Sequence, residues 1–237
     1  MIPRRIALVS AIPASGTACA GDAGVSEHDG AASLDATARF VLSDLAEAYT
    51  VYTRMGAVDG SAPEVDSELP PACHLLEIRD GYQGGAGAGS APASAGHSEP
   101  FDALVVALAL DLPDPDAPIA ALSSTLDHLG SGLLSGSPVY ALLLTPSAQL
   151  GSLDHLSPAL SSTCQAHGLS WNGALVIADA AILPALARSP RMGMFRRPVS
   201  EAIDRLILAL RTGSASADEV VCTRIPCVAR HWFTRRR

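Results

Sequence analysis

The chain has 237 residues, of which 48% are hydrophobic and 17% charged, and its formal net charge is −8 at pH 7. This length fits one α/β domain with insertions and is sufficient to bury a sizeable core. No segment approaches the roughly 18 uninterrupted apolar residues of a membrane span, and an aromatic content of 4% offers no stacking platform for nucleic acid. We therefore expect neither a membrane nor a nucleic-acid partner.

The distribution of charge and of cysteines bears on the partners of the protein and on its cellular compartment. All sixteen basic residues are arginine, and eleven of them lie in residues 188–237, against four acidic residues there. This basic end either steers an anionic partner or serves only as a solvated surface. Five widely spaced cysteines without a CxxC pair favour free thiols in a reducing, cytoplasmic compartment. The cysteines are Cys19, Cys73, Cys164, Cys222 and Cys227.

The first informative element is a short apolar run, Ile6 to Val9, which predicts a central parallel strand covered on both faces. The turn that follows is rich in small and hydroxyl residues, namely Ser10, Ser15, Gly16 and Thr17. A strand that leads through such a turn into a helix is a ready anion site, because backbone amides and the helix dipole favour a phosphate there. The segment therefore predicts a cofactor that carries a phosphate.

A second interpretation of the same residues is a secretory signal or a lipoprotein cleavage site ending at Cys19 and Ala20. Its apolar core would be only about seven residues long before Pro13, at the low end of the usual range. Gly16 also stands where a lipoprotein site has a larger apolar residue. We favour the strand.

Helices and strands then alternate along the chain. Apolar residues at helical spacing from Leu34 to Tyr52 predict a helix with Ser33 as its N-cap. Further strands are expected over 73–79, 101–108, 138–145 and 171–178. The intervening helices are expected to start at Pro118, over 153–164 with a restart at Pro158, and at Pro198 with a cap at Gly213.

This alternation predicts a five-stranded parallel sheet with right-handed crossovers between two helical layers. We expect a single domain over residues 1–213 with insertions near 18–32, 53–72 and 81–99, followed by a basic tail over 214–237. In strand order 2-1-3-4-5, a ligand crevice lies where the carboxyl ends of strands one, three and four meet.

Several short sequence motifs occur one after another along the predicted strands and turns. Ser10, Ser15 and Thr17 form the pattern S-x-x-x-x-S-x-T, and LLEIRD follows at 75–80. FDA opens the third strand at 101–103, and SGSPVYALLLT covers 135–145. Together with the end of the chain, from WNGALVIA onward, these motifs resemble the NADPH-dependent FMN reductases and other flavodoxin-like oxidoreductases. The resemblance covers most of the chain outside the three insertions.

The resemblance implies a flavodoxin-like fold and a bound FMN that takes a hydride from NADPH. The phosphate would lie on Ser10, Ser15, Gly16 and Thr17, and the flavin ring between two later loops. Those loops would contribute Ala109, Leu110, Asp111, Leu112, Thr145, Pro146 and Ser147. No side chain is required as a general acid or base, and no metal is implied, because the flavin carries the chemistry. A small-molecule electron acceptor and a homodimer are further expectations.

The chain also departs from this family. Its third loop reads ALDLPDPDAP, where relatives have a Ser or Thr followed by Pro-x-Tyr. Asp111, Asp114 and Asp116 would repel a phosphate or a reduced flavin there, or would collect a hard cation, although a solvated acidic turn is the simpler interpretation. The alternative function is therefore a non-catalytic flavodoxin-like binding or interaction protein that has lost FMN.

Three arginines near the last predicted helix leave a choice open as well. Arg191, Arg196 and Arg197 would bind the 2′-phosphate of NADPH, contact a partner subunit, or only solvate the surface.

Overall fold

The computed structural model describes residues 5–12, 28–58, 72–76, 99–110, 114, 116–146, 155–187, 193–216 and 218–223. In these residues six parallel strands form one sheet with the order β2-β1-β3-β4-β5-β6. The strands are β1 (Arg5–Ser10), β2 (Ala72–Leu76), β3 (Ala103–Ala109), β4 (Pro138–Leu144), β5 (Ser170–Ala178) and β6 (Glu219–Cys222). This arrangement confirms the predicted flavodoxin-like α/β sandwich, with one strand more than the five expected.

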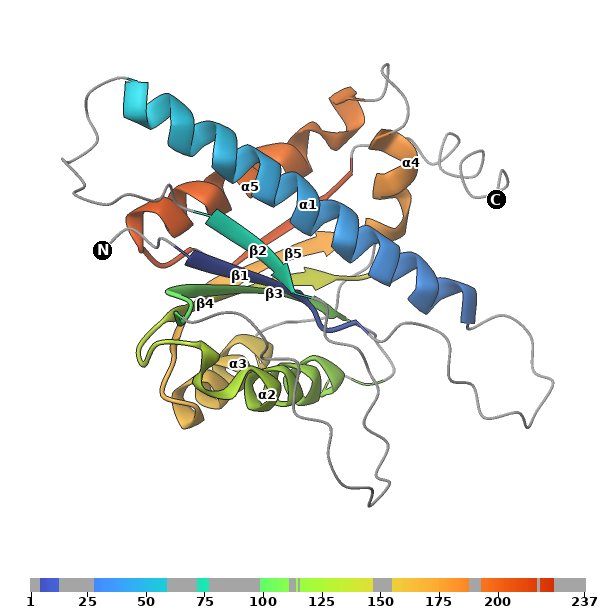
Figure 1. The fold of residues 1–237 in the computed structure, drawn as a ribbon. Coiled ribbons are helices and arrows are strands. Elements are labelled where there is room, and N and C mark those ends of the chain that lie inside the picture. The colour runs from blue at the N-terminus through green and yellow to red at the C-terminus, as the bar shows by residue number, and fades with distance from the viewer. Residues whose placement is uncertain are drawn as a thin grey trace, which may run out of the picture.

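Helices cover both faces of the sheet (Figure 1). One layer contains α1 (His28–Val58), α4 (Leu183–Ala187) and α5 (Gly193–Thr212), with the short 3-10 turn η2 (Ala180–Ile182). The other contains α2 (Ala117–Leu129) and α3 (Leu156–Ala166), with the 3-10 turn η1 (Gly130–Gly132). Among the described helices, none has both the length and the apolar character needed to cross a bilayer.

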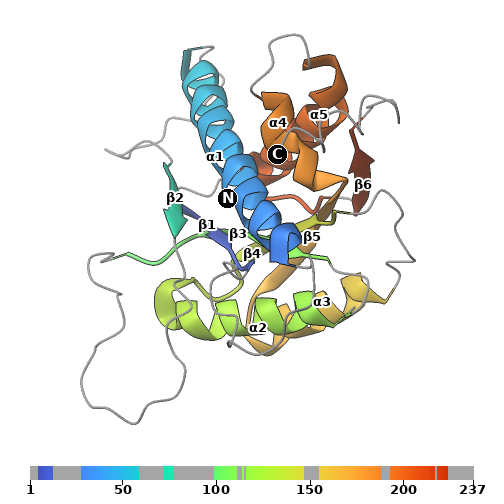
Figure 2. The ribbon, with the colours of Figure 1, turned by 90° about the vertical axis from the view of Figure 1, so that its right-hand side faces the viewer.

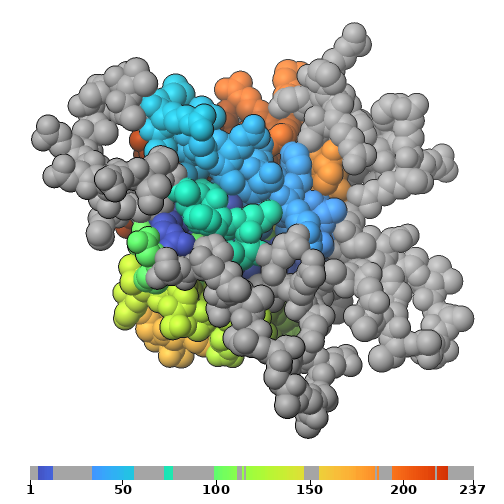
Figure 3. Space-filling view, viewed as in Figure 1, coloured from blue at the N-terminus to red at the C-terminus, as the bar shows by residue number. Residues whose placement is uncertain are grey.

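The apolar strands divide their side chains between two cores, because successive residues of a strand point to opposite faces. Ile6 and Leu8 of β1 face the layer of α1, whereas Ala7 and Val9 face the layer of α2 and α3. The same division holds along β3, β4 and β5, which explains why these strands read as continuous apolar runs. α1 lies beside β2 on the surface shown in Figure 3.

The first helix is longer at both ends than its apolar pattern predicts. α1 begins at His28 and ends at Val58, so Ser33 lies inside it and the predicted N-cap is wrong. Residues 28–32 and 53–58, which were expected in insertions, are therefore helical. The apolar pattern from Leu34 to Tyr49 marks the part of the helix that packs on the sheet, and it carries no signal for the turns beyond that contact.

The last helix also starts earlier than expected. α5 begins at Gly193, five residues before Pro198, which lies inside the helix. Tertiary contacts hold this first part, because Arg196 pairs with Asp44 of α1 and its guanidinium lies 5.0 Å from the ring centre of Phe40. The predicted cap is confirmed at the other end, where Gly213 has a positive φ of 62°.

The sixth strand lies in the segment that was expected to be a tail. β6 pairs in parallel with the outer side of β5, from Leu175 opposite Glu219 to Ala178 opposite Cys222. The sheet order advances in one direction from β3 through β4 and β5 to β6. The connections within β3-β4-β5 pass through α2 and α3 on one face, whereas the connection from β5 to β6 passes through α5 on the opposite face. This last crossover is therefore left-handed (Figure 2). This crossover leads to a strand outside the predicted five-stranded sheet, for which right-handed crossovers were expected. α1 covers the β1 side of its face, so α5 fills the remaining space over β5, and the free edge of β5 is the nearest one for the chain to join.

A buried polar cluster joins β4 and β5 to the end of α5. The Tyr140 hydroxyl donates to the Ser214 carbonyl at 2.8 Å, and Asn172 Nδ2 donates to the Tyr140 oxygen at 3.1 Å. The Ser216 amide donates to the Asn172 carbonyl at 2.6 Å. These bonds satisfy polar groups that would otherwise be costly to bury, and they fix the chain as it turns toward β6.

Candidate functional site

The strand order defines a topological switch point between β1 and β3. From β1 the chain crosses through α1 to β2 on one side, whereas from β3 it crosses through α2 to β4 on the other side. Consequently α1 and α2 lie on opposite faces of the sheet and diverge at its carboxyl edge. The strands point toward this edge in Figure 1, and the edge faces the viewer in Figure 2. In open α/β sheets ligands bind in the crevice that this divergence creates.

At the end of β1 the predicted phosphate ligand Ser10 lies next to a carboxylate. Its Oγ donates to Asp35 Oδ1 of α1 at 3.1 Å, and Arg39 Nε donates to Asp35 Oδ2 at 3.0 Å. The Asp35 side chain is largely buried, with 15% of its surface exposed. Ser10 thus has a hydrogen-bonding partner within the protein, and its hydroxyl proton points to a negative group.

At the ends of β3 and β4 the described backbone amides are used by the sheet itself. The Leu110 amide donates to the Leu144 carbonyl at 2.8 Å, and the Thr145 amide donates to the Ile177 carbonyl at 3.1 Å. Leu110 and Thr145 are buried, Ala109 is half-buried and Pro146 is exposed. These four predicted site residues therefore lie at the carboxyl edge of the sheet.

The remaining predicted site residues, Ser15, Gly16, Thr17, Asp111, Leu112 and Ser147, lie outside the described residues. The structure brings together the ends of β1, β3 and β4 through the register that sets Ser10 opposite Ala107 and Ala109 opposite Leu144. The described members of the predicted site consequently share one edge of the sheet.

The aspartates of the third loop stand at the start of α2. Asp114 Oδ1 accepts a hydrogen bond from the Asp116 amide at 3.1 Å, and both residues are exposed. A carboxylate at this position stabilises the positive end of the helix dipole. Within the described part of the chain, no three His, Cys, Asp or Glu residues are grouped so that they could hold a metal ion.

One residue at this edge was not predicted as part of the site. Asp179 follows β5 in the left-handed conformation, with φ 58° and ψ 33°, and is 9% exposed. Its Oδ2 accepts a hydrogen bond from the hydroxyl of Thr223, just after β6, at 3.4 Å. An aspartate directly after an apolar strand is a sequence signal that could have marked this position, but its partner Thr223 follows a strand that was not expected.

Two of the three arginines near the last helix make contacts within the chain. Arg196 pairs with Asp44, and Arg197 Nε donates to Glu201 Oε1 at 2.7 Å, one turn further along α5. Arg191 lies outside the described residues.

In sum, the carboxyl edge carries the described members of the predicted site together with the carboxylates of Asp35, Asp114, Asp116 and Asp179. Arg39, one turn further along α1, forms an ion pair with Asp35. A bound anion would need donors other than the amides of Leu110 and Thr145, which already bond to neighbouring strands. Comparison of the chain with protein-family models, curated proteins and solved structures finds no match.

Proposed function

We propose that this protein is an FMN-dependent NAD(P)H oxidoreductase whose cofactor lies in the crevice between the carboxyl ends of β1 and β3. The observation that carries the proposal is the switch point itself, because β1, β3 and β4 end side by side between two diverging helices. The hydroxyl-rich turn from Ser10 to Thr17 leaves from the same place. A cytoplasmic homodimer that reduces a flavin or another small molecule with NADPH belongs to the same proposal.

The contribution of the chain would be binding and orientation. The chemistry that FMN supplies when bound is acceptance of a hydride from a nicotinamide and transfer of electrons to an acceptor. The amides of Leu110 and Thr145 bond to neighbouring strands, and this would fix the points from which the two ring-binding loops start. The amides of residues 13–17 would hold the phosphate, because Ser10 already donates to Asp35.

The visible absorption spectrum of the purified protein, taken after incubation with FMN and gel filtration, tests this proposal. We expect a retained flavin spectrum that bleaches when NADPH is added without oxygen. The variants Ser15→Trp and Thr17→Trp should lose the flavin, because a bulky side chain in the turn blocks approach to its amides. Ser135→Trp is the matched control, since Ser135 is exposed at the opposite edge of the sheet.

Two results would count against the oxidoreductase. One is a colourless protein that releases all added FMN, and the other is NADPH oxidation at the same rate with and without bound flavin. Retention of FMN by Ser15→Trp and Thr17→Trp would instead remove the phosphate assignment and leave the activity open.

The second candidate is a non-catalytic flavodoxin-like protein without FMN, and the Asp35 carboxylate beside Ser10 is the observation that favours it. The variant Asp35→Asn separates the two candidates. If FMN binds near Ser10, removal of the charge should tighten binding about fivefold at low salt, by the Coulomb energy of charges a few ångströms apart. Asp127→Asn, which changes the net charge equally at the opposite edge, should leave the affinity for FMN unchanged. No binding to either variant favours the non-catalytic protein.

A further inference from the structure

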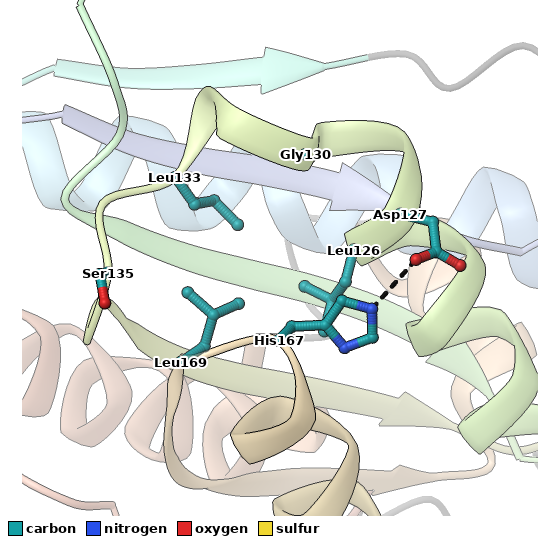
Figure 4. A pocket seen from close by; sticks show the side chains of 7 residues that line it. All are labelled: Leu126, Asp127, Gly130, Leu133, Ser135, His167 and Leu169. Atoms are coloured by element: carbon teal, nitrogen blue, oxygen red, sulfur yellow. Dashed lines mark hydrogen bonds and ion pairs between the residues drawn. The ribbon is translucent and has the colours of Figure 1, made fainter.

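A pocket of about 270 Å³ lies at the amino edge of the sheet, away from the switch point. The helices run antiparallel to the strands, so this edge carries the carboxyl ends of α2 and α3. Figure 4 shows leucine side chains converging in the pocket and a histidine closing one end of it. The lining residues are Leu126, Asp127, Gly130, Leu133, Ser135, His167 and Leu169.

His167 connects the two helices through both of its ring nitrogens. Nδ1 lies 2.9 Å from the Thr163 carbonyl oxygen of α3, and Nε2 lies 3.1 Å from Asp127 Oδ1 of α2. A carbonyl and a carboxylate only accept hydrogen bonds, so each bond requires a proton on the ring nitrogen. Both bonds exist together only when the imidazole is protonated, because a neutral ring carries a single N–H.

The position of the ring favours the same protonation state. His167 is the C-cap residue of α3, where the helix dipole stabilises a positive charge. The hydrogen bond to the Thr163 carbonyl and then the bond to Asp127 raise the pKa of His167 above its ordinary value of 6.5.

The same geometry argues against a hydrolase at this pocket. Ser135 lies on the far side of Leu169 from the histidine (Figure 4). Since both ring nitrogens of His167 already have partners, the ring has no nitrogen left to accept a proton from the Ser135 hydroxyl.

We propose that His167 is a proton-dependent tie between α2 and α3: the protonated ring holds Thr163 and Asp127 at once, and the neutral ring holds only one of them. Loss of the bond to Asp127 frees that side chain, 72% of which is exposed, and opens one end of the pocket. The bond to Thr163 lies within α3, whose last turn is also held by the backbone bonds of His167 and Leu169 to the Cys164 carbonyl, so the bond to Asp127 is the one that connects the two helices. This proposal is independent of the proposed function.

The surroundings leave one charged partner for the ring. On α2 the titratable residues at this end are Asp127 and its neighbour His128, and only Asp127 makes a described bond to His167. The residues of η1, the turn over 133–137, α3 and the beginning of β5 add no acidic or basic side chain. Cys164 of α3 is fully buried in the apolar core. A change in ring charge is therefore felt mainly through Asp127.

Because folding raises the pKa of His167, the tie contributes its full stability below pH 6.5 and loses it as the pH rises through the pKa of the folded protein. The effect on stability is small, since both side chains contact solvent. A local measurement is thus sharper than a melting curve.

NMR titration of the full chain provides that measurement, with the His167 ring followed alongside the backbone amides of residues 127–130. We expect a ring pKa above 6.5 and α2 amides that titrate with the same midpoint. Asp127→Asn should lower the ring pKa and abolish the response of the α2 amides. His128→Gln, which removes the neighbouring imidazole, should change neither.

Two outcomes overturn the proposal. A ring pKa at or below 6.5 in the unmodified protein would mean that the two bonds do not favour the charged ring. Amides at the end of α2 that do not change as His167 titrates would mean that protonation of the ring does not control the bond between the helices.

Discussion

At Gly173 the protein has no room for any side chain. Its φ is +116°, a conformation that other residues rarely adopt, and a Cβ atom there would lie 2.2 Å from the Ser216 carbonyl oxygen. That close approach belongs to the segment in which the Ser216 amide bonds to Asn172. One glycine thus allows β5 to contact the chain that leads into β6.

The substitution Gly173→Ala should therefore destabilise the protein by about 2 kcal/mol or more, through backbone strain and steric overlap together. Urea denaturation followed by circular dichroism measures the change. Gly132→Ala is the matched control, because its Cβ would meet nothing within 4 Å and its φ lies outside the positive range. Equal stability of the two variants would show that the Ser216 segment moves aside without cost.

Single residues also show which features of the site could be predicted from the sequence and which could not. Ser10 was predicted at the end of a strand because a hydroxyl directly follows an apolar run, and it lies there. Its partner Asp35 is 25 positions away on a helix whose start was misplaced, so no local pattern could pair them. Asp179 was missed for a related reason, since its interaction with Thr223 depends on the unexpected β6.

Among the elements, β6 offers the clearest test. Val221 points into the core and is 8% exposed, whereas Val220 on the same strand points outward and is 53% exposed. Val221→Asp should cost about 3 kcal/mol or more, because it buries an unpaired charge. Val220→Asp should stay within about 0.5 kcal/mol.

Thermal denaturation of both variants measures this difference. Similar losses for the two valines would mean that β6 has no inward and outward face in solution. A small loss for Val221→Asp alone would mean that the strand leaves the sheet at little cost.

The helices and strands differ in how well they can be predicted from the sequence. β3 and β4 are long apolar runs buried on both faces, and the predicted boundaries agree closely with the observed ones. β6 has only four residues, EVVC, in a segment dominated by small, polar and basic residues. The early start of α5 depends on contacts between Arg196 and α1, which periodicity along α5 cannot reveal.

For the molecule as a whole, two cores share one sheet. Cys164 lies fully buried in the core of α2 and α3, and burial raises the pKa of its thiol to about 12. The same sheet supports the core of α1, α4 and α5 on its other face. Loss of either helical layer would expose one face of the sheet to water and destabilise the strands on which the other layer packs. The two cores should therefore unfold together.

Thiol labelling at pH 8 with peptide mass spectrometry tests this coupling. Cys222, which is exposed, should react at once, and Cys164 should react only when the protein opens. The free energy of that opening should equal the unfolding free energy from circular dichroism, within about 1 kcal/mol. A much lower value for Cys164 would show that the layer of α2 and α3 opens alone.

At this scale the alternation of apolar strands and amphipathic helices was sufficient to predict the sandwich, and the predicted order of its first five strands is confirmed. This alternation was not sufficient to predict the left-handed crossover from β5 to β6. That handedness depends on which part of the sheet remains uncovered after α1 has packed. The character of the crevice likewise depends on side chains that come from separate elements.

The left-handed connection to β6 has a consequence for the order in which the chain folds. We expect the strand to pair with β5 only after α5 has packed against α1, because α5 is the element that connects β5 to β6. Pairing of β6 is thus expected to be absent from the folding transition state. Weakening it should speed unfolding while leaving the refolding rate nearly unchanged.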